Sequence, residues 1–155
     1  MIIREGSPRL DKTTSDTHGT VETARYSDAG GISQYGSYVQ TLLPGARSSD
    51  RHWHEQEDEF LYVLAGQVTV TENDGEHVLG PGDAASWPAG VSNAHHVSNM
   101  SDAPRSYLIV GTRVTNDICH YPDAGRTLHT EGQNWRIVDA DGAILKSGHI
   151  LGVPD

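Results

Sequence analysis

Short apolar runs separated by turn residues constrain the fold of this chain more than any other feature. YGSYVQTLL (35–43), EFLYVLAG (59–66) and RSYLIVGTRV (105–114) are bounded by Pro-, Gly- and Asp-containing turn sequences. Such residues tolerate the backbone conformations of tight turns. No long segment shows the apolar spacing of an amphipathic helix. Many short strands of this kind predict an all-β sandwich or barrel.

Charge and cysteine content narrow the choice of partners and compartment. The formal net charge is −10, which disfavours nucleic acid and anionic membranes as partners because both require a positive face. No segment approaches the roughly 20 apolar residues of a membrane span, and the N-terminal residues lack the apolar core of a signal peptide. Cys119 is the single cysteine, so no intramolecular disulfide can form and we expect a cytoplasmic protein.

The two ends of the chain differ in pattern from its centre. Residues 1–24 are largely polar with no sustained period, which favours a loosely packed N-terminal arm that covers a sheet edge. The segment NWRIVDADGAILKSG (134–148) predicts a hairpin around Asp141 and Gly142, because Asp-Gly is a preferred hairpin turn.

A histidine pair precedes one of the predicted strands, in the sequence RHWHEQEDEF (51–60). His52 and His54 are two residues apart, so a strand would place both rings on one face. Two convergent imidazoles form half of a site for a divalent metal ion. Glu59 opens the next strand and could project into a barrel beside them, or it could be the last member of a solvated acidic loop.

A second pair, His95 and His96, follows about forty residues later. Adjacent strand residues face opposite ways, so only one ring can join the first pair. One register places His95 inward together with Val97, and the other places His96 inward with Ala94 and Ser98. Val97 is the better core residue, which favours His95.

These motifs resemble the two motifs of the cupin superfamily, G-x5-H-x-H-x(3,4)-E-x6-G and G-x5-P-x-G-x2-H-x3-N. The matching residues are Gly45, His52, His54, Glu59 and Gly66 in the first motif, and Gly82, Pro88, Gly90, His95 and Asn99 in the second. Gly45 lies one residue further from His52 than the pattern has it, and the gap from Gly90 to His95 is two residues longer. HWH, YVLAG, HH, VGTR and YPD also resemble a bacterial subgroup of cupins, some of whose members look like sugar phosphate isomerases.

The resemblance implies an all-β, double-stranded β-helix (jelly-roll) barrel over residues 25–125, with residues 126–155 as a C-terminal hairpin or extension that packs on it. It also implies a homodimer, and one divalent transition metal ion (Mn, Fe, Ni, Co or Zn) held by His52, His54, Glu59 and His95. Four protein ligands of six would leave two positions for water or a small-molecule substrate.

Two functional hypotheses follow from this resemblance. One is a metal-dependent enzyme with isomerase- or dioxygenase-type chemistry on a small oxygen-rich metabolite. The alternative is a non-catalytic module that binds a sugar or an organic acid. Other residues are expected to be structural: Arg113 in a surface ion pair, Cys119 as a half-buried apolar residue, Glu57 in solvent, and His18 and His120 on the surface.

Overall fold

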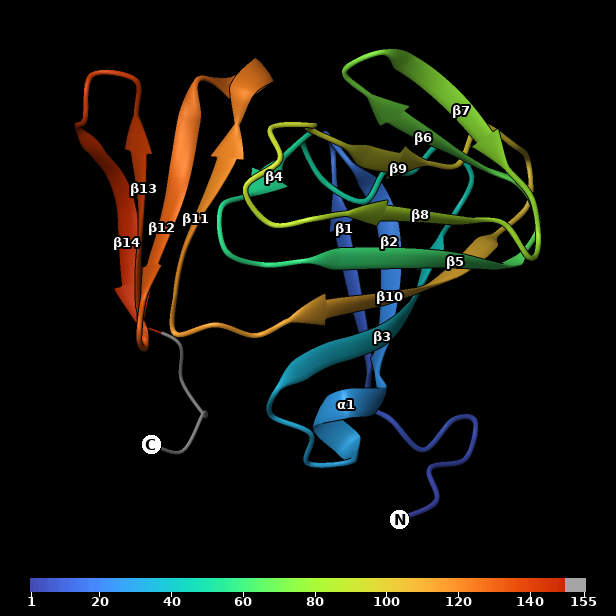
Figure 1. The fold of residues 1–155 in the computed structure, drawn as a ribbon. Helices are drawn as coiled ribbons and strands as arrows, with labels where there is room; N and C mark the ends of the chain where they lie inside the picture. The colour runs from blue at the N-terminus through green and yellow to red at the C-terminus, as the bar shows by residue number, and fades with distance from the viewer. Residues whose placement is uncertain (150–155) are drawn as a thin grey trace.

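The computed structural model describes residues 1–149, which form three antiparallel sheets and very little helix (Figure 1). The six-stranded sheet has the order β1 (Leu10–Ser15), β2 (Gly19–Arg25), β3 (Tyr35–Leu42), β10 (Arg105–Thr112), β5 (Glu59–Ala65) and β8 (Ala84–Trp87). The three-stranded sheet has the order β7 (Gly75–Leu79), β6 (Val68–Glu72) and β9 (His96–Ser98). The five-stranded sheet has the order β14 (Ile144–His149), β13 (Asn134–Asp139), β12 (Arg126–Glu131), β11 (Asn116–Tyr121) and β4 (Trp53–His54). The helical segments are α1 (Tyr26–Ala29) and η1 (Pro122–Ala124), and no helix of the described chain is long and apolar enough to cross a membrane.

The first two sheets pack face to face and enclose one apolar core. Val68, Val70 and Val97 of the small sheet belong to the same buried cluster as Leu42, Leu61, Val63, Tyr107 and Ile109 of the large one. Burial of such side chains supplies most of the free energy that holds two sheets together. The prediction of an all-β jelly-roll barrel is confirmed.

The alternation of β5 decides which side chains enter the barrel. Leu61 and Val63 are fully buried, whereas Phe60 and Tyr62 are about two-fifths exposed on the outer face of the sheet. Because successive strand residues point to opposite faces, the same parity turns Glu59 inward. Its side chain is only 15% exposed.

Both chain ends form strands. The polar residues expected to form a loose arm instead contain the hairpin of β1 and β2, which extends the large sheet beyond β3. Cross-strand pairs hold this hairpin: Lys12 Nζ donates to Glu22 at 2.9 Å, and the hydroxyls of Thr14 and Thr20 are 3.0 Å apart. Polar strands of this type lack the apolar alternation by which the sequence predicts a strand.

The C-terminal strands stand beside the barrel as a separate layer (Figure 1). The predicted hairpin is present as β13 and β14, although residues 150–155 of the expected extension lie outside the described residues. β11 joins this layer to the barrel by pairing with β4, where Cys119 lies opposite His54. The histidine pair therefore lies where the barrel meets the C-terminal sheet.

Asn99 connects the loop after β9 to the end of β3. It is fully buried, and its side-chain nitrogen donates to the carbonyls of Leu42 and Ala103 at 2.9 Å. Its side-chain oxygen accepts hydrogen bonds from the backbone and hydroxyl of Ser101. The loop beneath His95 is thus held by a side chain whose polar atoms are all satisfied, as burial requires.

We expect Asn99→Ala to lower the free energy of unfolding by roughly 2–4 kcal/mol, because it removes the hydrogen bonds of a fully buried side chain, including the donor to the Leu42 carbonyl. Urea denaturation with an unchanged slope measures the effect. Asn116→Ala, at an exposed position of β11, is the control and should change stability by no more than about 0.5 kcal/mol. Equal stability of the two variants would contradict a structural role for Asn99.

Candidate metal centre

Backbone pairing brings His52 and His95 together from segments that are far apart in the sequence. The two residues form an isolated antiparallel bridge. The His52 amide donates to the His95 carbonyl at 3.0 Å, and the His95 amide donates to the His52 carbonyl at 2.9 Å. Directly opposed residues present their side chains on the same face, and the ring centroids are 4.9 Å apart.

Glu59 lies at the centre of the histidine group. Its Oε2 atom is 3.0 Å from His95 Nε2 and 3.7 Å from His52 Nε2. His54 Nε2 is 3.9 Å from the same oxygen. The structure therefore brings all four predicted residues together, with every Nε2 atom directed at one carboxylate oxygen. His95, buried to 4% exposure, occupies this position, and His96 does not.

Each histidine uses its other ring nitrogen, Nδ1, to contact an acceptor outside the cluster. His52 Nδ1 is 3.1 Å from the Asp50 carbonyl, and His95 Nδ1 is 3.4 Å from the Asn93 carbonyl. His54 Nδ1 is 2.6 Å from Asp117 Oδ2. Each Nδ1 atom can therefore keep its proton on an outer acceptor while Nε2, which in His95 donates to Glu59, exchanges its proton for a metal ion; this is the tautomer that a metal ion requires.

Asp117 is a functional residue that the sequence did not indicate. It comes from β11, its side chain is 7% exposed, and its second carboxylate oxygen accepts from the Gln56 amide at 2.9 Å. Nothing in the spacing of NDICHY relates Asp117 to the histidines more than sixty residues earlier. Only the pairing of β11 with β4 brings them into contact.

Burial and hydrogen bonds set the charges of the cluster. Burial lowers the pKa of His52 to about 4, so its ring is neutral at pH 7. Burial opposes ionisation of Glu59, but the hydrogen bond with His95 and the nearby His52 and His54 outweigh it and lower the Glu59 pKa to about 2. Burial also opposes charge on His54, but the hydrogen bond to Asp117 outweighs it and raises the His54 pKa above its usual range.

Several residues that were expected to be solvated or without partners lie at or near the cluster. Glu57 lines the cavity beside His54, and burial raises its pKa. Cys119 is 2% exposed, and its sulfur lies within 4.8 Å of ligand atoms of both His52 and His54, so it offers a further donor. His120 contacts Glu55 at 2.8 Å and does have a partner. The acidic residues of the EQEDE segment look alike in the sequence, and only the tertiary structure distinguishes their environments.

Arg113 lies away from the cluster, and its ion-pair assignment holds. Its guanidinium donates to Asp28 and, at 3.0 Å, to the Ile32 carbonyl. Arg113 directly follows β10, so these contacts connect α1 to the end of that strand. The contacts of this arginine are therefore structural.

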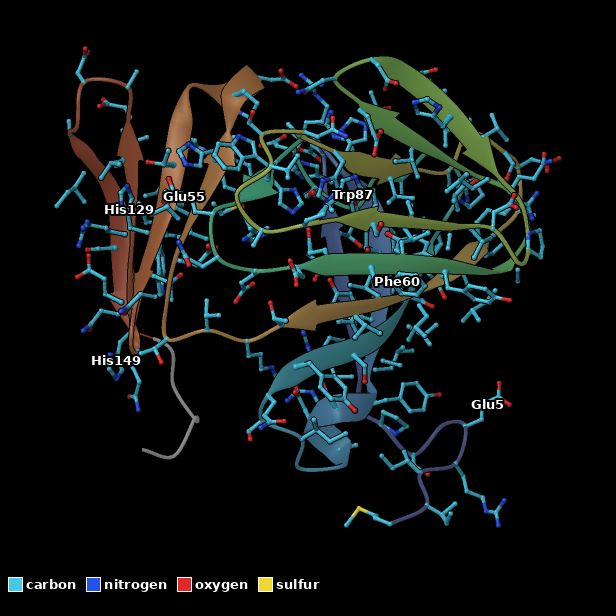
Figure 2. The ribbon with its side chains drawn as sticks, in the orientation of Figure 1. Glu5, Glu55, Phe60, Trp87, His129 and His149 are labelled. Carbon is cyan, nitrogen blue, oxygen red and sulfur yellow. The ribbon has the colours of Figure 1, made fainter. Side chains whose placement is uncertain are left out.

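A cavity of about 340 Å³ opens at the cluster. Trp87 forms part of its wall and stacks on His95 with ring centroids 3.6 Å apart; Figure 2 shows this tryptophan between the two barrel sheets. Hydroxyl and amide groups line much of the remainder, and they belong to Tyr38, Gln40, Ser48, Ser49, Tyr107 and Tyr121. A small polyhydroxylated molecule could form hydrogen bonds with these groups.

The donor set fits a divalent transition metal ion. His52, Glu59 and His95 offer ligand atoms within 4.8 Å of one another, and His54 is directed at the same carboxylate. Imidazoles that lose their Nε2 protons to a metal ion, together with a carboxylate, suit the borderline divalent ions of the first transition series. The second-sphere acceptors on all three Nδ1 atoms are those that metal-bound histidines normally have.

Comparison with known proteins identifies the family. Residues 38–111 match the model of the cupin domain. A protein of Silicibacter pomeroyi, described as a sugar phosphate isomerase of the cupin superfamily, is 38% identical, with a TM-score of 0.78 over 84% of this chain and 83% of its own. A protein of Acidithiobacillus ferrooxidans, provisionally given the same activity, is 30% identical, with a TM-score of 0.76 over 82% of this chain and 81% of its own. The chain belongs to the cupin superfamily.

More distant similarities show the fold alone. A protein of Thermotoga maritima, described as a predicted oxalate decarboxylase, is 22% identical, with a TM-score of 0.62 over 74% of this chain and all of its own. No curated protein is a significant match in sequence.

We predict that Asp117→Asn weakens binding of a divalent ion by about 10–100-fold, because it removes the carboxylate that holds the His54 ring and its tautomer. Competition with a fluorescent chelator measures this affinity. Asp141→Asn, at an exposed turn position between β13 and β14, is the matched control and should bind like the unmodified protein. Unchanged affinity in Asp117→Asn would show that the hydrogen bond does not support the site.

The buried neutral state of His52 also predicts how stability depends on pH. Its pKa is about 4 when folded and close to 6.5 when unfolded, so the unfolded chain binds more protons between these values. Stability of the metal-free protein should therefore fall as the pH drops from about 6.5 to 4, by up to roughly 1.4 kcal/mol per pH unit for this group. His52→Asn should flatten the profile in denaturation experiments, whereas exposed His149→Asn should not; parallel profiles for all three proteins would contradict the assignment.

Proposed function

We propose that this protein is a metal-dependent isomerase of a sugar phosphate. The observation that carries the proposal is the convergence of three Nε2 atoms on Glu59 Oε2, at 3.0 to 3.9 Å, in the wall of a cavity lined by hydroxyl groups. The relative that is 38% identical and described as a sugar phosphate isomerase supports the choice of reaction. His52, His54, Glu59 and His95 would hold the ion, which would be Mn, Fe, Co, Ni or Zn.

The cavity suits a small sugar in size and in chemistry. Its volume of about 340 Å³ matches the lower end of typical ligand pockets. Tyr38, Gln40 and Tyr121 offer hydrogen bonds to hydroxyl groups, and Trp87 supplies an apolar surface. When bound, a divalent ion would supply Lewis acidity toward the oxygen atoms of the substrate.

In the enediol route, interconversion of an aldose and a ketose moves one proton between neighbouring carbon atoms and one hydroxyl proton between their oxygen atoms. Glu57 is the second carboxylate in the cavity, beside Glu59. Its Oε1 accepts weakly from the Val114 amide at 3.4 Å, while Oε2 stays 3.9 Å from His54. We assign Glu57 to carry this proton because Glu59 is engaged by imidazoles.

The neighbouring histidines provide a matched test. His95→Ala should lose both the bound metal and the turnover of sugar phosphates, because it removes a ring 3.0 Å from Glu59. His96→Ala, one residue further along, should retain about one equivalent of metal per chain. Elemental analysis of untagged protein, with a coupled assay on aldose and ketose phosphates, measures both effects.

The two readouts separate the parts of the proposal. Loss of metal from His96→Ala but not from His95→Ala would overturn the ligand set. A full complement of metal without turnover of any sugar phosphate would overturn the isomerase and leave the non-catalytic binding module as the better hypothesis.

A further inference from the structure

Two arginines and a histidine from three parts of the chain meet at Asp50, close to the cavity. Asp50 Oδ1 accepts from His18 Nε2 at 3.1 Å and from Arg47 Nη2 at 3.2 Å. Asp50 Oδ2 accepts from Arg126 Nη2 at 2.8 Å. These residues belong to the β1–β2 turn, the segment before β4, and the first position of β12. One carboxylate thus lies within reach of two arginines and a histidine.

Buried polar atoms without a hydrogen-bond partner lie in this group and beside it. Across residues 1–149, four buried side-chain polar atoms have no hydrogen-bond partner. Three of them are Arg47 Nε, Arg126 Nε and His96 Nδ1. His96 lies on the same face as Arg47, because Arg47 pairs with Ser98 two residues further along β9. Arg47 Nε and Arg126 Nε can only donate, so two unpartnered donors beside one carboxylate indicate a place for a further acceptor.

Arg51, in the same region, has the full set of hydrogen bonds expected of a structural arginine. Arg51 uses Nε and Nη2 on Asp123 at 2.9 and 2.8 Å, and Nη1 on Asn73 and the Glu72 carbonyl at 3.1 Å. Arg47 and Arg126 instead each make one side-chain hydrogen bond, to Asp50. Their side chains are 38% and 36% exposed, so a ligand in solution can reach them.

We propose that Arg47 and Arg126 form a binding site for a phosphate or phosphoryl group. Guanidinium groups match the geometry of phosphate oxygens and bind them through paired, charge-assisted hydrogen bonds. Asp50 holds the two arginines near each other while leaving most of their donors unused. The chain has a net charge of −10, so a cluster of arginines stands out against its overall composition.

The site adjoins the proposed metal centre through Tyr121. The ring of Tyr121 is 5.7 Å from the His52 ring, and the Arg126 guanidinium carbon is 5.1 Å from its centroid. The occupant is therefore either free phosphate or the phosphoryl group of a sugar phosphate whose other end reaches the cavity. The second source rests on the proposed isomerase function, whereas the site itself does not.

Phosphate titration of the metal-free full chain tests the site directly. Side-chain Nε–Hε signals in nitrogen-15 NMR spectra report on each arginine at low ionic strength. We expect inorganic phosphate to shift the signals of Arg47 and Arg126 to saturation. Arg47→Gln and Arg126→Gln should each weaken binding at least about tenfold. Arg136→Gln is the matched control, because Arg136 is also 38% exposed and has one carboxylate partner, Glu131, at 2.7 Å.

Asp50→Asn provides a test in the opposite direction. It removes a negative charge beside the proposed anion but keeps an oxygen that can accept from the arginines, so phosphate should bind more tightly. Unchanged or weaker binding would place phosphate elsewhere. Equal signal shifts at Arg136 and at the two proposed arginines, or no loss of affinity in the glutamine variants, would likewise overturn the site.

Competition distinguishes the two sources of the phosphoryl group. If the substrate occupies the site, a sugar phosphate displaces inorganic phosphate, and Arg126→Gln raises KM for that sugar phosphate. If free phosphate is the occupant, the sugar phosphate does not compete, and KM is unchanged. Phosphate binding without any turnover would remove the isomerase function and retain the anion site.

Discussion

The site depends on a carboxylate kept ionised inside a barrel. The alternation of β5 that buries Leu61 and Val63 also directs Glu59 inward. Burial alone would favour the neutral acid, but three imidazole nitrogens within 4 Å keep Glu59 charged. The histidines in turn lie in a region from which much water is excluded, and His52 stays neutral there. Each group is therefore stable in its position because the others are present, and the same arrangement suits a divalent cation.

The C-terminal sheet completes this arrangement from outside the barrel. β4 contains only two residues, and pairing with β11 holds it in place. Trp53 of β4 stacks on His120 of β11 with ring centroids 4.1 Å apart, and Asp117 of β11 orients His54. Residues 116–121 lie beyond the segment that matches the cupin domain, residues 38–111. The side chain that orients His54 thus comes from a strand outside the matched segment.

The sequence predicts those parts of the site that depend on the alternation of side chains along a strand. Strand parity was sufficient to group His52 with His54 and to favour His95 over His96, since Val97 needed a place in the core. It left Glu59 open between the barrel interior and a solvated loop, and only the resemblance to cupins placed Glu59 in the site. Strand parity does not indicate which distant strand pairs with a given strand, such as β11 with β4. Asp117 and the position of Glu57 follow from the register of β11 and from the loop before β5, and neither is encoded in a spacing.

The same distinction explains the misjudged N-terminal region. β1 and β2 are stabilised by cross-strand polar pairs such as Lys12 with Glu22, so their sequences lack an apolar period. The turn between them places His18 against Asp50. The N-terminal segment, expected to be a loosely packed arm, therefore contributes His18 to the group of basic residues at Asp50.

The positions of the positively charged side chains relative to the cavity bear on how a substrate would be recognised. None of the side chains that line the described cavity is arginine or lysine. An anionic group on a substrate would thus find no permanent cation among the chain's own residues inside it. Arg126 places fixed positive charge just outside, next to Tyr121, and Arg47 shares Asp50 with it. Separate sites for the sugar and the phosphoryl group would let a strongly acidic protein bind an anion without burying an unpaired arginine in its barrel, where desolvation would be costly.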